Sequence, residues 1–357
     1  MSSEIGSVRI VGAGLLGTSI GLALSKLGVD VSIDSKSRKS IELACEYGAG
    51  RPAEATDKPQ IVVVCVPPQL TAAKVLEALE AFPDAVVTDV ASVKGSVLKE
   101  LTDSGQAISR YVGSHPMAGR ERGGAIAGRA DLFVGRPWVI TSTPNTNSEA
   151  AESIRALALT LGAAPVDATP EQHDRAVALV SHAPQLISSL LASRLVDAED
   201  ADLALAGQGL RDTTRIAASD GQLWKQIIAA NAEQILPVLE NFAEDLVSLL
   251  NALANADEQI DEILEVITEG NLGVSRIPGK HGGKHADYAQ VVVMVDDKPG
   301  ELARLLTEVG QIGINLEELK LEHSPSAQMG LVELYVLPSA ESKLIDDLVL
   351  RGWRIAG

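Results

Sequence analysis

The sequence is poor in cysteine and in aromatic residues. Only two cysteines, Cys45 and Cys65, occur among 357 residues, and aromatic residues make up 3%. Both cysteines stand in apolar surroundings, without the spacing of a metal site or of a disulfide framework. This pattern predicts buried thiols in a reducing compartment. It argues against a secreted disulfide-rich domain, a catalytic cysteine and a metal centre.

Positive charge is also scarce. The 30 Lys and Arg residues face 48 Asp and Glu residues, a formal net charge of -18. Such a surface repels nucleic acid and anionic membranes. Met1–Ser7 has no basic segment followed by an apolar one, and later apolar stretches are interrupted by charge, His or Pro. We therefore expect a cytoplasmic protein without a nucleic-acid or membrane partner.

What the sequence does contain is a regular alternation of strand-like and helix-like segments over residues 1–168. The β-branched runs are almost entirely apolar, which is typical of parallel strands covered on both faces. They are Val8–Val11, Val29–Ile33, Ile61–Val66, Ala85–Thr88 and Trp138–Ile140, with helical patterns at Gly17–Leu27 and Thr71–Ala81. This order predicts βαβ units, hence an α/β first domain.

The pattern changes at Thr169. Thr169-Pro170-Glu171-Gln172 has the hydroxyl, proline and glutamine of a capping box, so a long helix should begin there. From there to Glu269 apolar residues recur at helical spacing, and Pro184 and Pro237 should kink the helices. We predict an all-helical domain over residues 169–270. Its helices are too apolar to stand alone, which favours a homodimer.

Residues 271–289, rich in Gly, Lys and His, read as a linker. Residues 290–357 follow the order strand, helix, strand, strand, helix, and Trp353–Ile355 is a candidate last strand. The third domain is therefore predicted to be an α+β unit of βαββαβ type.

A glycine-rich loop, Gly12-Ala13-Gly14-Leu15-Leu16-Gly17, directly follows the first strand and opens the first helix. In that context the glycines allow a tight turn, close approach of a pyrophosphate, and packing of helix on strand. Asp34, at the end of the second strand, can accept hydrogen bonds from an adenosine ribose. Together they predict a Rossmann-type NAD site, with Val66 and Pro67 at the same sheet edge. The alternative is that the glycines only shape a turn and Asp34 caps a helix. Lys36 and Arg38 keep NADP open.

Gly113-Ser114-His115-Pro116-Met117-Ala118-Gly119 places a histidine at a strand end in the same domain. An imidazole there, with an ordinary pKa near 6.5, suits a general base for alcohol oxidation. Alternatively, His115 is a loop histidine satisfied by the backbone.

Several segments together resemble the prephenate/arogenate dehydrogenase family over roughly Val8 to Glu269. They are Asp89-Val90-Ala91-Ser92-Val93-Lys94, Ser114 to Gly119 with Glu121, Asp174, Ser181-His182-Ala183-Pro184, Arg211 to Ala217, and Trp224. The resemblance implies an enzyme of tyrosine biosynthesis that oxidatively decarboxylates prephenate to 4-hydroxyphenylpyruvate with NAD, and it implies that residues 169–270 form a dimerisation domain.

By that resemblance His115 is the base, Ser92 orients the histidine and cofactor, and Arg215 binds a substrate carboxylate. Arginine suits this last task because its guanidinium binds carboxylates bidentately. The resemblance further implies that Asp174 or Glu121 holds Arg215 in place. The remaining substrate-site candidates are Ser114, His182, Gln185, Arg211, Asp212 and Trp224.

Gln185 departs from the family pattern, which has a second histidine there in many members. Glutamine hydrogen-bonds but carries no charge, so arogenate remains an alternative substrate. A second alternative is an NAD-bound amino-acid sensor without turnover, which the presence of both His115 and Arg215 disfavours.

The last domain resembles the ACT family at Asp296 to Leu302 and Gly310 to Leu316. That resemblance implies an amino-acid site. We expect feedback binding of tyrosine at Asp297, Gly300, Leu302, Gly313 and Asn315, the alternative being a domain that only assists oligomerisation.

Overall fold

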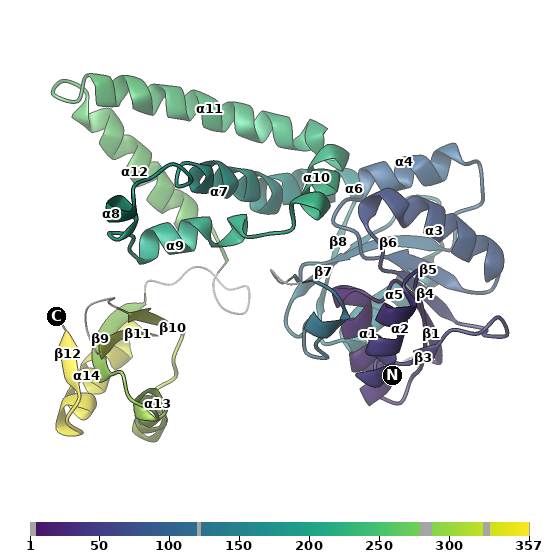
Figure 1. Cartoon of the computed structure of the whole chain (residues 1–357), viewed down its shortest axis with the longest axis horizontal. Helices are drawn as coiled ribbons and strands as arrows, with labels where there is room; N and C mark the ends of the chain where they lie inside the picture. The colour runs from purple at the N-terminus through teal and green to yellow at the C-terminus, as the bar shows by residue number, and fades with distance from the viewer. Residues whose placement is uncertain (1–4, 120–122, 279–287, 324–328, 357) are drawn as a thin grey trace. The chain divides into compact units, whose positions relative to one another are not determined.

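The computed structural model describes residues 5–119, 123–278, 288–323 and 329–356. The chain, drawn in Figure 1, divides into two compact units, residues 1–244 and 245–357.

The first unit is built on an eight-stranded sheet with the order β3-β2-β1-β4-β5-β6-β7-β8. The strands are β1 Ser7–Val11, β2 Asp30–Asp34, β3 Arg51–Pro52, β4 Ile61–Val64, β5 Val86–Asp89, β6 Tyr111–Pro116, β7 Pro137–Thr141 and β8 Ala164–Ala168. The helices are α1 Leu15–Lys26, α2 Arg38–Glu46, α3 Pro68–Ala81, α4 Gly95–Asp103, a short 3-10 turn η1 Ala125–Ala127, and α5 Ser148–Thr160. The predicted α/β class is confirmed, with one difference, because β7 runs antiparallel to β6.

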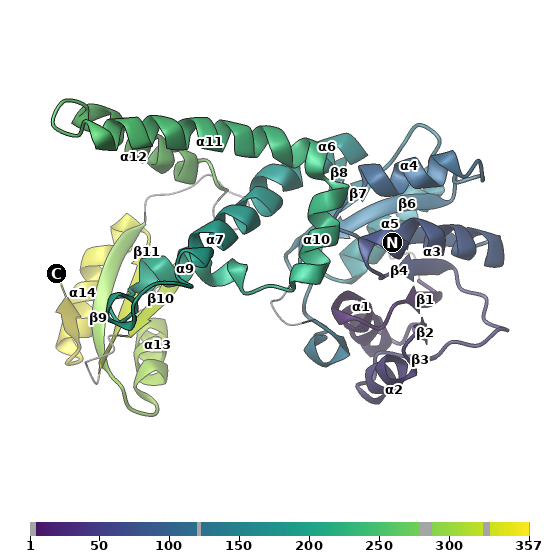
Figure 2. The same ribbon diagram turned by 45° about the horizontal axis from the view of Figure 1, so that its top comes forward.

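Each face of this sheet is covered by its own apolar core. Residues of α1, α2 and α5, such as Ile20 and Ile154, pack with Ile61 and Val63 on one face. Residues of α3 and α4 pack with the neighbouring Val62 on the other, and Figure 2 shows α1 and α2 apart from α3 and α4. Burial on both faces explains why the strand runs are continuously apolar.

The rest of the first unit is helical, as predicted. Its elements are α6 Pro170–Val177, the π-helical segment η2 Ala178–His182, α7 Ala183–Ser193, α8 Asp200–Leu203, α9 Gln208–Thr214, the 3-10 turn η3 Arg215–Ala217, α10 Gly221–Ala230 and the first part of α11 Ala232–Ala254. The capping box at Thr169 and Gln172 is present. Pro184 has no backbone N–H to donate to the carbonyl of Val180, four residues earlier. The absence of this α-helical hydrogen bond explains why the helix widens to π-helical geometry over η2.

The continuous helical stretch Pro170–Ser193 is, within the described ranges, long and apolar enough by length and composition to cross a bilayer. Its buried face, however, carries His173, Asp174, His182 and Gln185. All of these side chains make hydrogen bonds to protein groups. This polar, partnered face is the pattern of a helix packed inside a domain.

The second unit contains the end of α11, then α12 Ile260–Ser275, followed by a four-stranded antiparallel sheet of order β10-β11-β9-β12. Its elements are β9 Ala289–Asp296, α13 Glu301–Ile312, β10 Glu318–His323, β11 Met329–Val336, a 3-10 turn Pro338–Ala340, α14 Glu341–Leu350 and β12 Arg354–Ala356. The predicted βαββαβ order is confirmed. Helix α12 extends to Ser275, into the predicted linker, and residues 279–287 of that linker lie outside the described residues.

Candidate active site

The glycine loop forms the turn between β1 and α1. Gly12 has φ +117°, and an added Cβ would lie 2.2 Å from the carbonyl oxygen of Cys65; at Gly17 it would lie 2.0 Å from that of Gly12. At Gly14 no atom lies within 4 Å of an added Cβ. Gly12 and Gly17 therefore shape the loop, whereas Gly14 leaves open space where a diphosphate can approach the start of α1.

A cleft of 610 Å³ lies along the carboxyl edge beside this loop. It is lined by Gly12, Gly14, Asp34, Val66 and Pro67, which are five of the predicted cofactor residues. Leu15 and Leu16 form the first turn of α1 and Gly17 is buried beneath it. The open space at Gly14 together with the acidic group at the far end fits a dinucleotide.

The adenosine end of the cleft carries charges of both signs. The exposed carboxylate of Asp34 lies 3.8 Å from the guanidinium of Arg9. Lys36 also lines the cleft, whereas Arg38 forms an ion pair with Glu42 along α2. Asp34 is thus placed to accept hydrogen bonds from ribose hydroxyls, and the cations Arg9 and Lys36 line the same cleft.

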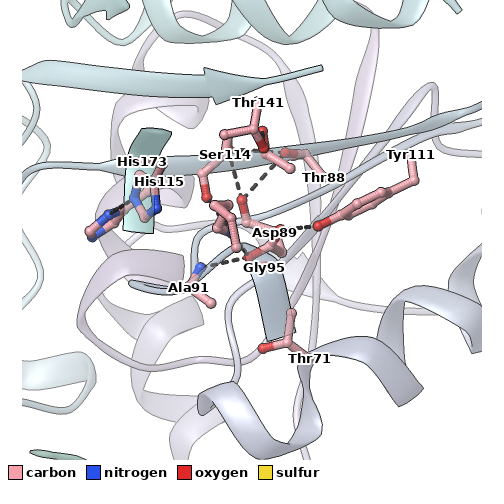
Figure 3. Close-up of polar contacts among 12 residues, drawn as sticks. Thr71, Thr88, Asp89, Ala91, Gly95, Tyr111, Ser114, His115, Thr141 and His173 are labelled. Carbon is pink, nitrogen blue, oxygen red and sulfur yellow. Dashed lines mark hydrogen bonds and ion pairs between the residues drawn. The ribbon is translucent and has the colours of Figure 1, made fainter. Parts of the chain in front are cut away.

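His115 lies near the carboxyl end of β6, which runs parallel to β5. Its ring is partly exposed, and its Nδ1 lies 2.8 Å from Nε2 of His173 in α6, with the two rings edge to face at 71° (Figure 3). Burial is the largest cause that holds the pKa of His115 well below 6.5, and repulsion between its protonated ring and the positive forms of His173, Lys94 and His182 adds to it. At neutral pH the ring is therefore uncharged and able to take up a proton.

His173 in turn hydrogen-bonds Asp174. Its Nδ1 lies 2.7 Å from Oδ1 of Asp174, and that carboxylate also accepts the backbone N–H groups of Lys94 (2.8 Å) and Gly95 (2.7 Å) at the start of α4. Although burial opposes ionisation, the bonds from His173, Gly95 and Lys94 lower the pKa of Asp174. The carboxylate is thus ionised and fixed between α4 and α6.

A second polar cluster is buried beneath this one. Lys94 Nζ donates to the carboxylate of Asp89 and to the carbonyl of Ser114 (2.8 Å). The hydroxyl of Tyr111 also donates to Asp89 (2.7 Å) (Figure 3). Burial lowers the pKa of Lys94 while Asp89 opposes that shift, and burial raises the pKa of Tyr111. The ion pair ties β5, β6 and the start of α4 together behind His115. In the sequence, Asp89 and Lys94 stand out only as part of the segment that carries the family resemblance.

Ser114, Ser92 and Glu121 are the other residues that the sequence predicts around His115. Ser114 points to the opposite face of β6, is fully buried, and donates its hydroxyl to the carbonyl of Asp89 (2.7 Å), so its side chain does not reach a substrate in this conformation. Ser92 is partly buried, and no hydrogen bond from its side chain to His115 is among the contacts of the described residues. Glu121 lies outside the described residues.

The helical part contributes a buried group of polar residues. The side-chain amide of Asn231 donates to Nδ1 of His182 (3.0 Å) and to the carbonyl of Asp174 (2.9 Å). Burial lowers the pKa of His182 to about 4. The ring of Trp224 in α10 lies edge-on to that of His182, with centroids 6.0 Å apart. Gln185, one turn after His182, is also buried and donates to Ser189 over 3.4 Å.

The predicted cationic residues lie on the adjoining segment of α9 and η3. Arg211, Asp212 and Arg215 are exposed there, and Ser188 of α7 holds the segment through the carbonyl of Thr213 (2.7 Å). Asp212 accepts a hydrogen bond from Gln208. The carboxylate of Asp174 points to His173 and α4, so the structure gives it a different neighbour from the Arg215 that the resemblance implies.

In the second unit, Gly300 and Gly313 stand at the two ends of α13, both with left-handed backbone. Asp297 is exposed, Leu302 packs against the domain core, and the amide of Asn315 donates to Glu317 (2.9 Å).

The dinucleotide loop, the acidic residue after β2 and an uncharged histidine on the same sheet define a nicotinamide-dependent oxidoreductase. Comparison with known proteins agrees. The nucleotide-binding domain of prephenate dehydrogenase matches residues 20–166, and its dimerization domain matches residues 169–269. The chain belongs to the prephenate dehydrogenase family and is an NAD-dependent enzyme.

Individual relatives support this assignment. The chain is 35% identical to the Streptomyces niveus protein named Probable prephenate dehydrogenase NovF, over 96% of this chain and 98% of that protein. It is 32% identical to a cyclohexadienyl dehydrogenase of Zymomonas mobilis, over 73% of this chain and 92% of that protein. Among solved structures, this chain superposes on prephenate dehydrogenase from A. aeolicus in complex with hydroxyphenyl propionate and NAD+ with a TM-score of 0.68 and 25% sequence identity, over 77% of this chain and 100% of that chain. It superposes on Synechocystis arogenate dehydrogenase with a TM-score of 0.64 and 28% sequence identity, over 76% of this chain and 99% of that chain.

Proposed function

We propose that this chain oxidises prephenate and that His115 is its general base. The observation that carries the proposal is the position of an uncharged imidazole near the carboxyl end of β6, on the same sheet as the dinucleotide cleft. A base must be neutral to accept a proton, and burial keeps this ring neutral at physiological pH.

In the reaction, Nε2 of His115 takes the proton of the ring hydroxyl as that carbon becomes a carbonyl. NAD, when bound, accepts the hydride released from the same carbon. The bond to the ring carboxylate then breaks, carbon dioxide leaves, and the bonding electrons aromatise the ring. The ring oxygen regains a proton, for which protonated His115 is the nearest donor, and the product is 4-hydroxyphenylpyruvate. His115 ends in its starting state.

A dianionic substrate requires local positive charge in a chain of net charge -18. We assign one carboxylate to Arg215, with Arg211, Asp212 and Trp224 at the border of the site and His182 and Gln185 behind it. An exposed guanidinium on η3 can bind a carboxylate bidentately.

The direct test replaces His115 with Asn and follows NADH by absorbance. NAD binding, measured by calorimetry, should be unchanged, and turnover should fall about 100- to 10,000-fold, which is the usual range for general-base catalysis. Turnover equal to that of the unmodified chain would remove His115 from the mechanism.

Arogenate is the second candidate substrate. Two observations support arogenate as a candidate: Gln185 carries no charge, and the chain is similar to an arogenate dehydrogenase. Initial rates measured with prephenate and with arogenate, each with NAD and with NADP, distinguish the two substrates and the two cofactors. We expect the highest kcat/KM for prephenate with NAD.

We also propose a homodimer formed through residues 169–269, the part matched by the dimerization-domain model. Large apolar side chains are exposed on the helices of a single chain, among them Leu190, Leu191, Leu236, Phe242, Leu264 and Ile267. Burying such side chains against a second copy is favourable. Sedimentation should give twice the mass of 37.4 kDa.

The free thiols of Cys45 and Cys65 lead us to place the protein in the reducing cytoplasm.

We further propose that tyrosine binds the βαββαβ domain near Asp297, Gly300, Leu302, Gly313 and Asn315. The start of α13 at Gly300 has no side-chain cap, so the first-turn amides of this helix have no side-chain acceptor. Calorimetry of the full chain with tyrosine, phenylalanine and tryptophan, repeated with Asn315→Ala, tests this. Heat with none of the three amino acids would leave the domain with an assembly role.

A further inference from the structure

We propose that His173 is a positioning residue that, together with Asp174, fixes His115 as the tautomer whose Nε2 is unprotonated. The inference rests on the proposed role of His115 as base, and it concerns two residues that touch neither substrate nor cofactor in that proposal. A series of hydrogen bonds runs from the start of α4 through Asp174 and His173 to His115. The positions of the protons in these bonds determine the tautomer of His115.

The proton positions can be worked out from the Asp174 end. Both carboxylate oxygens of Asp174 accept backbone N–H groups, from Lys94 and Gly95, so the carboxylate is an acceptor only. The hydrogen bond of 2.7 Å to His173 must therefore use a proton on Nδ1 of His173. When His173 carries only this one ring proton, its Nε2 is an acceptor.

The proton on the His115 ring is fixed in turn by His173. Because Nε2 of His173 accepts, the 2.8 Å contact requires a proton on Nδ1 of His115. The Nε2 atom of His115 is left with a free lone pair. The opposite tautomer of His115 would direct a lone pair at a lone pair of His173, so the contact selects the catalytically competent form.

The arrangement also prepares the site for the charge that forms during turnover. Lys94 and Asp89 neutralise one another beneath β6, and Asn231 donates to His182, which is uncharged. Among the described groups facing the two rings, Asp174 thus carries the uncompensated charge. When His115 takes up a proton, the positive charge is shared toward His173 and the Asp174 carboxylate. The bond from His115 strengthens because its donor becomes charged.

Burial supports a fixed geometry. His173 is 2% exposed and Asp174 is 5% exposed. The capping box at Thr169 starts α6 one turn before His173, which sets the height of the ring against β6. His173 therefore cannot exchange Asp174 for water without a movement of α6.

The kinetic test uses three variants of the full chain. His173→Ala removes the acceptor and should lower kcat about 100-fold, with the dissociation constant of NAD unchanged. His173→Gln can still accept from Nδ1 of His115 through its side-chain oxygen and should recover about tenfold of that loss. Arg175→Ala changes an exposed side chain on the same helix, leaves the contacts of His173 unaltered and should keep kcat within about twofold.

Nitrogen NMR of the histidine-labelled, NAD-free protein gives a readout independent of turnover. We expect His115 as the Nδ1–H form, and a mixture of tautomers in His173→Ala. An Nε2–H form of His115 in the unmodified protein, or full kcat in His173→Ala, would overturn the proposal. If His115→Asn is inactive while the His173 variants are fully active, only the positioning role fails; if His115→Asn is active, the proposed base fails.

Discussion

Replacing Gly14 with alanine should weaken NAD binding and leave the fold intact. Gly14 precedes α1 with φ -89° and ψ -164°, an extended conformation that alanine adopts readily. No atom lies within 4 Å of the added Cβ. The free energy of unfolding should therefore change by no more than about 0.5 kcal/mol. The methyl group would instead occupy the space that a diphosphate needs in order to reach the amides of the loop.

The neighbouring glycines give the opposite expectation. In Gly17→Ala the new Cβ would meet the carbonyl oxygen of Gly12 at 2.0 Å, and in Gly12→Ala it would meet that of Cys65 at 2.2 Å with a left-handed backbone. Backbone atoms cannot give way as a side chain does, so each variant should lose about 1–3 kcal/mol or more. That loss lowers Tm by several degrees in a unit of this size.

Calorimetry and thermal unfolding separate the two effects. For Gly14→Ala we expect the Kd of NAD to rise about tenfold or more, equivalent to about 1.4 kcal/mol, with an unchanged Tm. Gly310→Ala, an open position in α13, is the control for adding a methyl group. An unchanged Kd in Gly14→Ala would refute the placement of the diphosphate, and a large fall in Tm would refute the assignment of that space as open.

Three further outcomes are expected. Asp34→Ala should narrow the preference for NAD over NADP, because the carboxylate no longer repels a 2′-phosphate and Lys36 remains in the cleft; the ratio of kcat/KM values checks this. Arg215→Ala should raise the KM for prephenate about 10- to 150-fold, since a charge-assisted bond is worth about 1.5–3 kcal/mol, and should barely affect NAD; equal weakening of both would contradict its role. Because the pKa of His115 lies well below 6.5 and that of His182 is about 4, both rings are neutral when folded but protonate near 6.5 when unfolded. The free energy of unfolding, measured with urea, should therefore fall as the pH is lowered from 7 to 5. The decline of kcat/KM on the acid side should begin below pH 6.5, because His115 stays neutral down to its lowered pKa. A free energy of unfolding that does not change with pH would count against this.

Local patterns in the sequence were enough to predict most of the elements. The apolar runs Val8–Val11 and Ile61–Val66 predict buried strands, and the structure has strands at both. The capping box at Thr169 predicts a helix start because its hydrogen bonds join neighbouring residues. Each of these signals depends on residues within one or two turns of each other, so a single segment contains all the necessary information.

The direction of β7 could not be read in the same way. Parallel neighbours need a crossover, usually a helix, whereas the described connection between β6 and β7 holds only the short turn η1. The strand therefore returns antiparallel. Strands and helices alternate elsewhere in the domain, so the sequence pattern predicts parallel strands and gives no sign that β7 is antiparallel to β6. The orientation of Ser114 was missed for a related reason, because successive side chains of β6 face opposite sides of the sheet and only one side holds His115.

The partner of His115 is the part of the site that local patterns do not reveal. His173 lies 58 residues further along the chain, beyond the predicted domain boundary at Thr169, and nothing near either histidine indicates the other. Yet the boundary and the contact are linked, since the helix that starts at Thr169 brings His173 against β6 one turn later. A boundary drawn at Thr169 therefore passes through the site, and the α/β part alone would carry His115 without the acceptor that orders its protons. This dependence gives a physical reason for residues 1–244 to form one compact unit, in which the helices complete the chemistry that the sheet begins.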